Sequence, residues 1–203
     1  MAESDPKADL HRYLQDAREA LLWKLDGLSE YDIRRPLVPT GTNLLGLIKH
    51  LAYVELGAFG VTFGRPSADR PTWDESDPNA DMFAAPEESR DFITGLYRRA
   101  WTHADATIQA LALSATGRVP WWPTDRNEVT LHHMLVRVAT ETSRHAGHAD
   151  IIRELIDGST GLTAERPNLP PSGKASWQAH RDRVERAAQE AASNSNGLHR
   201  LNS

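Results

Sequence analysis

The stretch Glu141-Thr-Ser-Arg-His145-Ala-Gly-His148 lies inside a long helical pattern that runs from about residue 129 to residue 156. An α-helix turns by about 100° per residue, so Glu141, His145 and His148 fall within roughly 60° of one another on its surface. One carboxylate and two imidazoles therefore point in nearly the same direction from one rigid element. These groups are common ligands of transition metals, and one more ligand from another helix would complete a site.

The rest of the chain carries helical patterns and no alternating pattern of the kind that predicts strands. We expect helices over residues 8–28, 42–63, 86–113, 129–156 and 174–192. The third is predicted to begin at Pro86-Glu87-Glu88, because proline and acidic residues favour the first helical turn. The second is apolar nearly all round, which predicts a central position.

This order of elements predicts an all-α protein: a four-helix bundle with an extra C-terminal helix. We place the bundle in residues 1–160. Residues 161–203 are interpreted as a linker, the C-terminal helix and a disordered tail, because the linker is rich in Pro, Gly and Ser and the tail in Asn and Ser.

Composition excludes several classes of function. The chain has 203 residues, a net charge of −5 and no cysteine. The negative charge argues against nucleic acid as a partner. The lack of cysteine excludes disulfides, a thiolate nucleophile in the chain and Cys-ligated zinc, and it suits a reducing compartment. We find no signal-peptide pattern and no stretch that approaches the ~20 apolar residues of a membrane span, so we expect a soluble, cytoplasmic protein with no membrane partner.

His50 interrupts the most apolar helix of the chain. A buried imidazole needs a partner for each ring nitrogen, and a metal is one such partner. On spacing alone two interpretations of residues 141–148 remain open. The stretch is either a metal site or a solvated helix face on which Glu141 pairs with His145 and Arg144 pairs with His148.

The run from Glu141 to Glu154 resembles the last core helix of the DinB/YfiT-like superfamily, especially its actinobacterial DinB-like branch. The segment Leu44-Leu-Gly-Leu-Ile-Lys-His50-Leu-Ala52 is similar to that family's second-helix motif, whose histidine is a metal ligand. The similarity covers roughly residues 8–160. It implies an up-down-down-up four-helix bundle that binds a metal.

The resemblance implies that His50, Glu141 and His145 are the metal ligands. The implied ion is divalent: zinc, with nickel or iron as alternatives. The Glu-x-x-x-His pair is similar to that of mycothiol-dependent maleylpyruvate isomerases, whereas many other members have two histidines there. His148 would then be a supporting group beside the ligands, an alternative ligand or a proton shuttle. Arg137 stands where several relatives have another histidine, so identical chemistry is not implied.

Three protein ligands leave a coordination position open, as in catalytic zinc sites. Such an ion lowers the pKa of a bound thiol or water. Because the chain has no cysteine, the thiol must be a small molecule, and the resemblance implies mycothiol. We therefore expect a metal-dependent thiol S-transferase or isomerase that acts on a small electrophile.

Two alternatives remain. One is a metal-water hydrolase with His148 or Glu55 as general base, and the other is a non-catalytic metal- or ligand-binding stress-response bundle whose site His148 closes as a fourth ligand. Trp121 and Trp122 are expected either to line the pocket or to pack their loop onto the bundle end. Arg144 is a candidate for binding a substrate carboxylate. Because relatives are often dimers, a homodimer is expected by analogy.

Overall fold

The structure is a computed structural model that describes residues 5–70, 72 and 76–201, with side chains described up to residue 193. The chain divides into two compact units, one up to residue 167 and one from residue 168. The second unit contains α6 (Lys174–Leu201), whose described side chains are almost all exposed. The candidate metal-binding residues all lie in the first unit.

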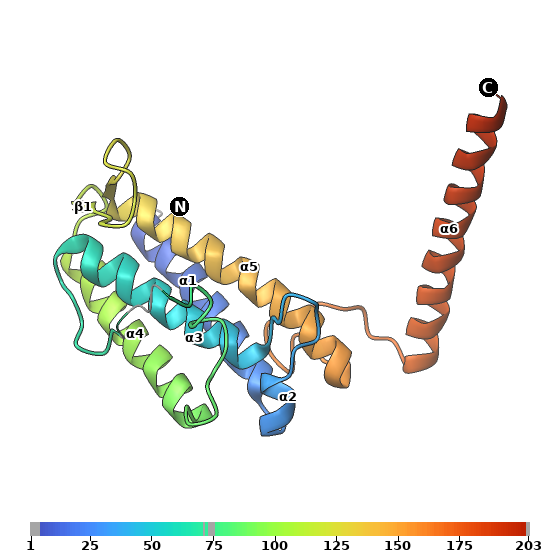
Figure 1. The fold of residues 1–203 in the computed structure, drawn as a ribbon, viewed down its shortest axis with the longest axis horizontal. Helices are drawn as coiled ribbons and strands as arrows, with labels where there is room; N and C mark the ends of the chain where they lie inside the picture. The colour runs from blue at the N-terminus through green and yellow to red at the C-terminus, as the bar shows by residue number, and fades with distance from the viewer. Residues whose placement is uncertain (1–4, 71, 73–75, 202–203) are drawn as a thin grey trace. The chain divides into compact units, whose positions relative to one another are not determined.

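Four long helices build the first unit: α1 (Pro6–Leu22), α3 (Leu44–Glu55), α4 (Arg90–Ala110) and α5 (Leu131–Asp157). Helix α1 packs along α5, α3 packs along α4, and α3 also contacts α5 (Figure 1). Buried apolar side chains from all four helices fill the interior. The predicted four-helix bundle with an additional C-terminal helix is therefore confirmed.

The segment after α1 differs from the prediction, which extended the first helix to residue 28. Helix α1 ends at Leu22, and a 3₁₀ turn at Trp23–Leu25 and the short helix α2 (Glu30–Arg34) follow it. Gly27 has a φ of 73°, a conformation that glycine adopts without strain, and it lies between these two elements.

Helix α3 runs through the centre of the bundle. It begins after Asn43, whose Oδ1 accepts a hydrogen bond from the backbone N–H of Gly46 at 2.8 Å. After Glu55 the helix continues as a π-helical turn at Leu56–Gly60 and a 3₁₀ turn at Val61–Phe63. Such π turns occur often beside functional sites.

The span Leu44–Phe63 is long and apolar enough to cross a membrane by length and composition, contrary to our expectation from the sequence. Its most apolar window is, however, 78% buried inside the bundle. A buried core helix of a soluble protein has the same properties, because it is apolar on every side.

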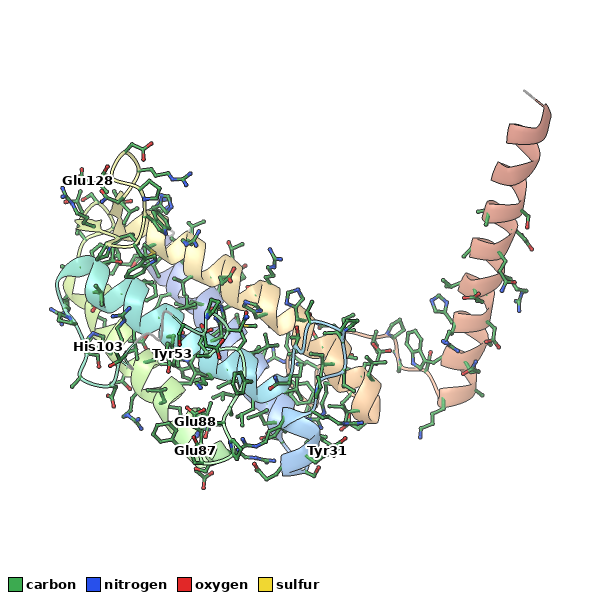
Figure 2. The ribbon with its side chains drawn as sticks, viewed as in Figure 1. Tyr31, Tyr53, Glu87, Glu88, His103 and Glu128 are labelled. Atoms are coloured by element: carbon green, nitrogen blue, oxygen red, sulfur yellow. The ribbon has the colours of Figure 1, made fainter. Side chains whose placement is uncertain are left out.

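Helix α4 begins at Arg90 and not at Pro86, so the predicted start is wrong. Ser89 caps the helix, because its Oγ accepts a hydrogen bond from Phe92 N at 3.0 Å. Glu88, which Figure 2 shows near this end of α4, is instead engaged with α3. Its Oε2 accepts hydrogen bonds from Lys49 Nζ at 2.8 Å and from Ala85 N at 2.7 Å.

Two short strands that the sequence did not predict, β1 (Thr116–Arg118) and β2 (Glu128–Thr130), form an antiparallel hairpin. Three residues are too few to display a recognisable alternation. The hairpin projects the loop that contains Trp121 and Trp122 and leads directly into α5. Helix α5 ends at Asp157, one residue beyond the predicted range, and Gly158 caps it with a φ of 83°.

Candidate metal centre

His50 from α3 and the pair Glu141 and His145 from α5 bring their side chains together. One ligand atom of each lies within 4.8 Å of the other two. Nε2 of His145 is 3.1 Å from Oε1 of Glu141, and Nε2 of His50 is 3.8 Å from the same oxygen. The i, i+4 spacing places two of these groups on one face of α5, and the contact of α3 with α5 brings the third to that face.

His145 is the most buried member of the group, with 8% of its surface exposed. Burial lowers the pKa of His145 because it disfavours the imidazolium, and repulsion from His50 lowers this pKa further. The nearby carboxylate of Glu141 opposes these effects. The neutral imidazole that results is the form that donates a lone pair to a metal.

Asp81 orients His50 from behind. Oδ2 of Asp81 accepts a hydrogen bond from Nδ1 of His50 at 2.8 Å, and Asp81 is only 5% exposed. A proton on Nδ1 leaves the lone pair of Nε2 directed at Glu141. A carboxylate that accepts a hydrogen bond from the other ring nitrogen of a ligand histidine is typical of metal sites. Sequence reasoning missed Asp81 because no fixed spacing connects a loop residue to a helix. The only signal was the length of the loop that contains it.

Lys49 of α3 forms hydrogen bonds with the segment around Asp81. Its Nζ donates hydrogen bonds to the carbonyl oxygens of Ala80 at 2.9 Å and Phe83 at 3.1 Å, in addition to Oε2 of Glu88. Lys49 is 6% exposed. Since these contacts lie on both sides of Asp81, Lys49 sets the position of the carboxylate that orients His50.

His148 lies outside the converging ligand atoms. Its Nδ1 is 3.3 Å from Nδ1 of His145, whereas the Nε2 of His145 faces Glu141. His148 therefore contacts the far side of the His145 ring, where it can hold the proton on Nδ1. This geometry does not support His148 as a fourth ligand.

Glu55 belongs neither to this group of three side chains nor to the lining of the cavity beside His50, so the structure does not support it as a general base. Its side chain is fully buried and accepts a hydrogen bond from Nε of Arg18 at 2.8 Å. Burial raises the pKa of Glu55, and the charge of Arg18 opposes that effect. The pair belongs to the bundle interior.

A cavity of about 520 Å³ opens beside His50. Its lining side chains include Tyr53, Arg70, Trp121, Trp122 and Arg137. Figure 2 shows Tyr53 on α3. The volume suits a small organic ligand, and the mixture of aromatic and charged walls is typical of binding pockets.

The two tryptophans of the hairpin loop differ in their surroundings. Trp122 packs against the apolar core, whereas Trp121 is 53% exposed and lies against Gly57. A Cβ atom at Gly57 would come within 3.0 Å of Cη2 of Trp121, so the indole ring depends on this glycine for its close approach. Arg144, the other substrate-binding candidate, is exposed on α5 and is not among the residues that line the cavity.

These features define a class of protein: a helical bundle in which one histidine of a central helix meets a Glu-x-x-x-His pair of the last core helix beside a cavity. Residues 9–158 match the family model of mycothiol-S-transferases, and the chain belongs to this DinB-like family. Membership of this family supports the assignment of the protein as a mycothiol-related transferase. The resemblance inferred from the sequence is thereby confirmed.

The structure is also similar to a solved structure, described as the crystal structure of a conserved protein of locus from Enterococcus faecalis. The match has a TM-score of 0.56 and 14% sequence identity, and it covers 77% of this chain and 100% of the other. At 14% sequence identity, this similarity shows only that the two proteins share a fold. No curated protein matches the chain.

Proposed function

We propose that the protein is a metal-dependent transferase that joins mycothiol to a small electrophile at a centre held by His50, Glu141 and His145. The observation that carries the proposal is the convergence of these three side chains beside the cavity. Two imidazoles and one carboxylate suit zinc, with nickel or iron as alternatives. The hydrogen bond from His50 to Asp81 supports this assignment, because it leaves the correct nitrogen free to coordinate.

A divalent ion with three protein ligands has an open position at which it would lower the pKa of a thiol. The chain contributes no cysteine, so the reacting sulfur has to come from the cosubstrate. Asp81 and His148 hold protons on the Nδ1 atoms of His50 and His145. Trp121 and Trp122 contribute apolar walls that hold the electrophile and exclude water. In the transfer, sulfur bonds to the electrophilic carbon, the leaving group departs with its electron pair, and the thiol proton passes to solvent.

The experiment measures the fluorescence of the conjugate formed from mycothiol and monochlorobimane by the zinc-loaded protein. We expect a rate well above the uncatalysed one and its loss in His50→Ala and His145→Ala. The control is His180→Ala, an exposed histidine of α6, which should keep the full rate. A rate no higher than that of His50→Ala would overturn the proposal for this electrophile. Ester or amide hydrolysis without thiol would favour metal-water hydrolysis instead. We place the protein in the cytoplasm, since a cysteine-free chain that uses a free thiol suits a reducing compartment.

A further inference from the structure

Two arginines line the cavity from different elements. Arg137 comes from α5, and Arg70 comes from the segment that follows the 3₁₀ turn after α3. The guanidinium carbon of Arg137 lies 4.9 Å from the ring centre of Trp122, and that of Arg70 lies 5.8 Å from the ring centre of Trp121. Each cavity arginine therefore lies over one tryptophan of the hairpin loop. An aromatic face holds a guanidinium plane in place and leaves the N–H groups at its edge available as donors.

Arg70 and Arg137 give the cavity two positive charges, against one carboxylate among the described residues that line it. Within the part of the chain that the structure describes, no carboxylate forms an ion pair with Arg70 or Arg137. The carboxylate that lines the same cavity, Asp81, is bound to Nδ1 of His50. The N–H donors of both arginines are thus available to a ligand that occupies the cavity.

We propose that Arg137 and Arg70 bind a carboxylate of the electrophile, so that the protein selects anionic electrophiles. The proposal rests on the transferase function above. A guanidinium matches a carboxylate through two parallel hydrogen bonds, which are stronger than bonds between neutral groups. Apart from its sulfur, mycothiol offers neutral hydroxyl and amide groups. Its sulfur is assigned to the centre at His50, Glu141 and His145, so a second negative charge has to come from the other reactant.

This assignment replaces the role that the sequence suggested for Arg144. Arg144 and Arg137 are both exposed arginines of α5, but only Arg137 lines the cavity. The difference arises because the hairpin loop covers the beginning of α5 and brings Trp122 over Arg137.

The test uses two electrophiles of similar size and with the same leaving group, the anionic iodoacetate and the neutral iodoacetamide. Because their intrinsic reactivities toward thiols differ, each kcat/KM is divided by the uncatalysed rate constant of the same electrophile. With either electrophile, the sulfur–carbon bond forms, the carbon–iodine bond breaks, iodide takes the electron pair and the thiol proton goes to solvent. We expect the zinc-loaded protein to show a higher kcat/KM for iodoacetate after this division. In Arg70→Gln/Arg137→Gln this preference should fall by about tenfold or more, through the KM of iodoacetate. The KM of mycothiol should stay unchanged.

Arg98→Gln is the matched control, because Arg98 is an exposed arginine of α4 that does not line the cavity. Arg98→Gln should retain the preference for iodoacetate. Arg137→Lys should retain part of this preference, because lysine keeps the positive charge but cannot donate two parallel hydrogen bonds to one carboxylate. Equal kcat/KM values for the two electrophiles after the same division, in the unsubstituted protein, would overturn the proposal. So would a rise in the KM of mycothiol in the double variant with the preference unchanged, because the arginines would then bind the thiol.

A binding measurement separates this proposal from the transferase function. Succinate and its diamide are titrated against the zinc-loaded full chain while tryptophan fluorescence is recorded, because both arginines lie over tryptophans. We expect succinate to bind more tightly than the diamide, and the difference to disappear in Arg70→Gln/Arg137→Gln. This result would support the anion site even if no electrophile were conjugated, in which case the transferase function alone would fail. Equal binding of succinate by the variant and the unsubstituted protein would overturn the anion site.

Discussion

Nδ1 of His50 lies 2.8 Å from Oδ2 of Asp81, so a carboxylate from a loop orients an imidazole of the central helix. The two residues belong to different elements, and Lys49 holds the loop at the distance that this contact requires. The candidate centre therefore depends on a loop as well as on the two helices that provide its ligand atoms.

Asp81→Ala should weaken zinc binding by about 10- to 100-fold, the usual effect of removing a group that orients a metal-binding histidine. Competition with a chromophoric chelator measures the affinity. Asp81→Asn should lie between Asp81→Ala and the unsubstituted protein, because its amide oxygen still accepts from Nδ1. His50→Ala provides the lower limit. An affinity unchanged in Asp81→Ala would show that His50 needs no such partner.

Lys49→Met should weaken zinc binding although Lys49 donates no hydrogen bond to a ligand residue. The variant removes three hydrogen bonds that hold Ala80, Phe83 and Glu88, so Asp81 loses its fixed position. The matched control is Lys7→Met, because Lys7 also holds backbone carbonyls, at Gln109 and Leu111, where no ligand lies.

The effect of Lys49 is distinguished from general destabilisation by a double variant. Asp81→Ala/Lys49→Met should bind zinc about as weakly as Asp81→Ala alone, since both changes act through one contact. Additive losses would mean that Lys49 acts on the centre by another route. The affinities are measured at a temperature at which circular dichroism shows every variant folded.

From the sequence, helical spacing placed Glu141, His145 and His148 on one face of a helix, and the family resemblance selected Glu141, His145 and His50 as the candidate ligands. Glu141 and His145 share a face because they are four residues apart, and His50 was recognisable as a polar interruption of an apolar helix. Asp81 was not predictable in this way, because its position results from tertiary hydrogen bonds. The same contacts explain the wrong start of α4: Glu88 has a helix-start pattern, but its carboxylate is bound to Lys49.

Arg18→Met should lower the free energy of unfolding by about 3–5 kcal/mol, because it leaves the fully buried carboxylate of Glu55 without its counter-charge. Urea denaturation monitored by circular dichroism measures this loss. Arg18→Met/Glu55→Met should recover much of it, since no unpaired charge then remains between α1 and α3. A double variant less stable than Arg18→Met would show that the two charges are not a coupled pair.

Gly57→Ala and Gly147→Ala should have opposite consequences, although both replace a helical glycine. An added Cβ at Gly147 meets nothing within 4 Å, so the lower backbone entropy of alanine should stabilise the protein by about 0.5–1 kcal/mol. An added Cβ at Gly57 meets Cη2 of Trp121 at 3.0 Å and should push the indole away from α3. Because Trp121 lies under Arg70, this displacement should also alter the cavity wall.

We expect Gly57→Ala to change the tryptophan emission and raise the KM of iodoacetate, and Gly147→Ala to change neither. An unchanged emission and KM in Gly57→Ala would mean that Trp121 takes no part in the cavity.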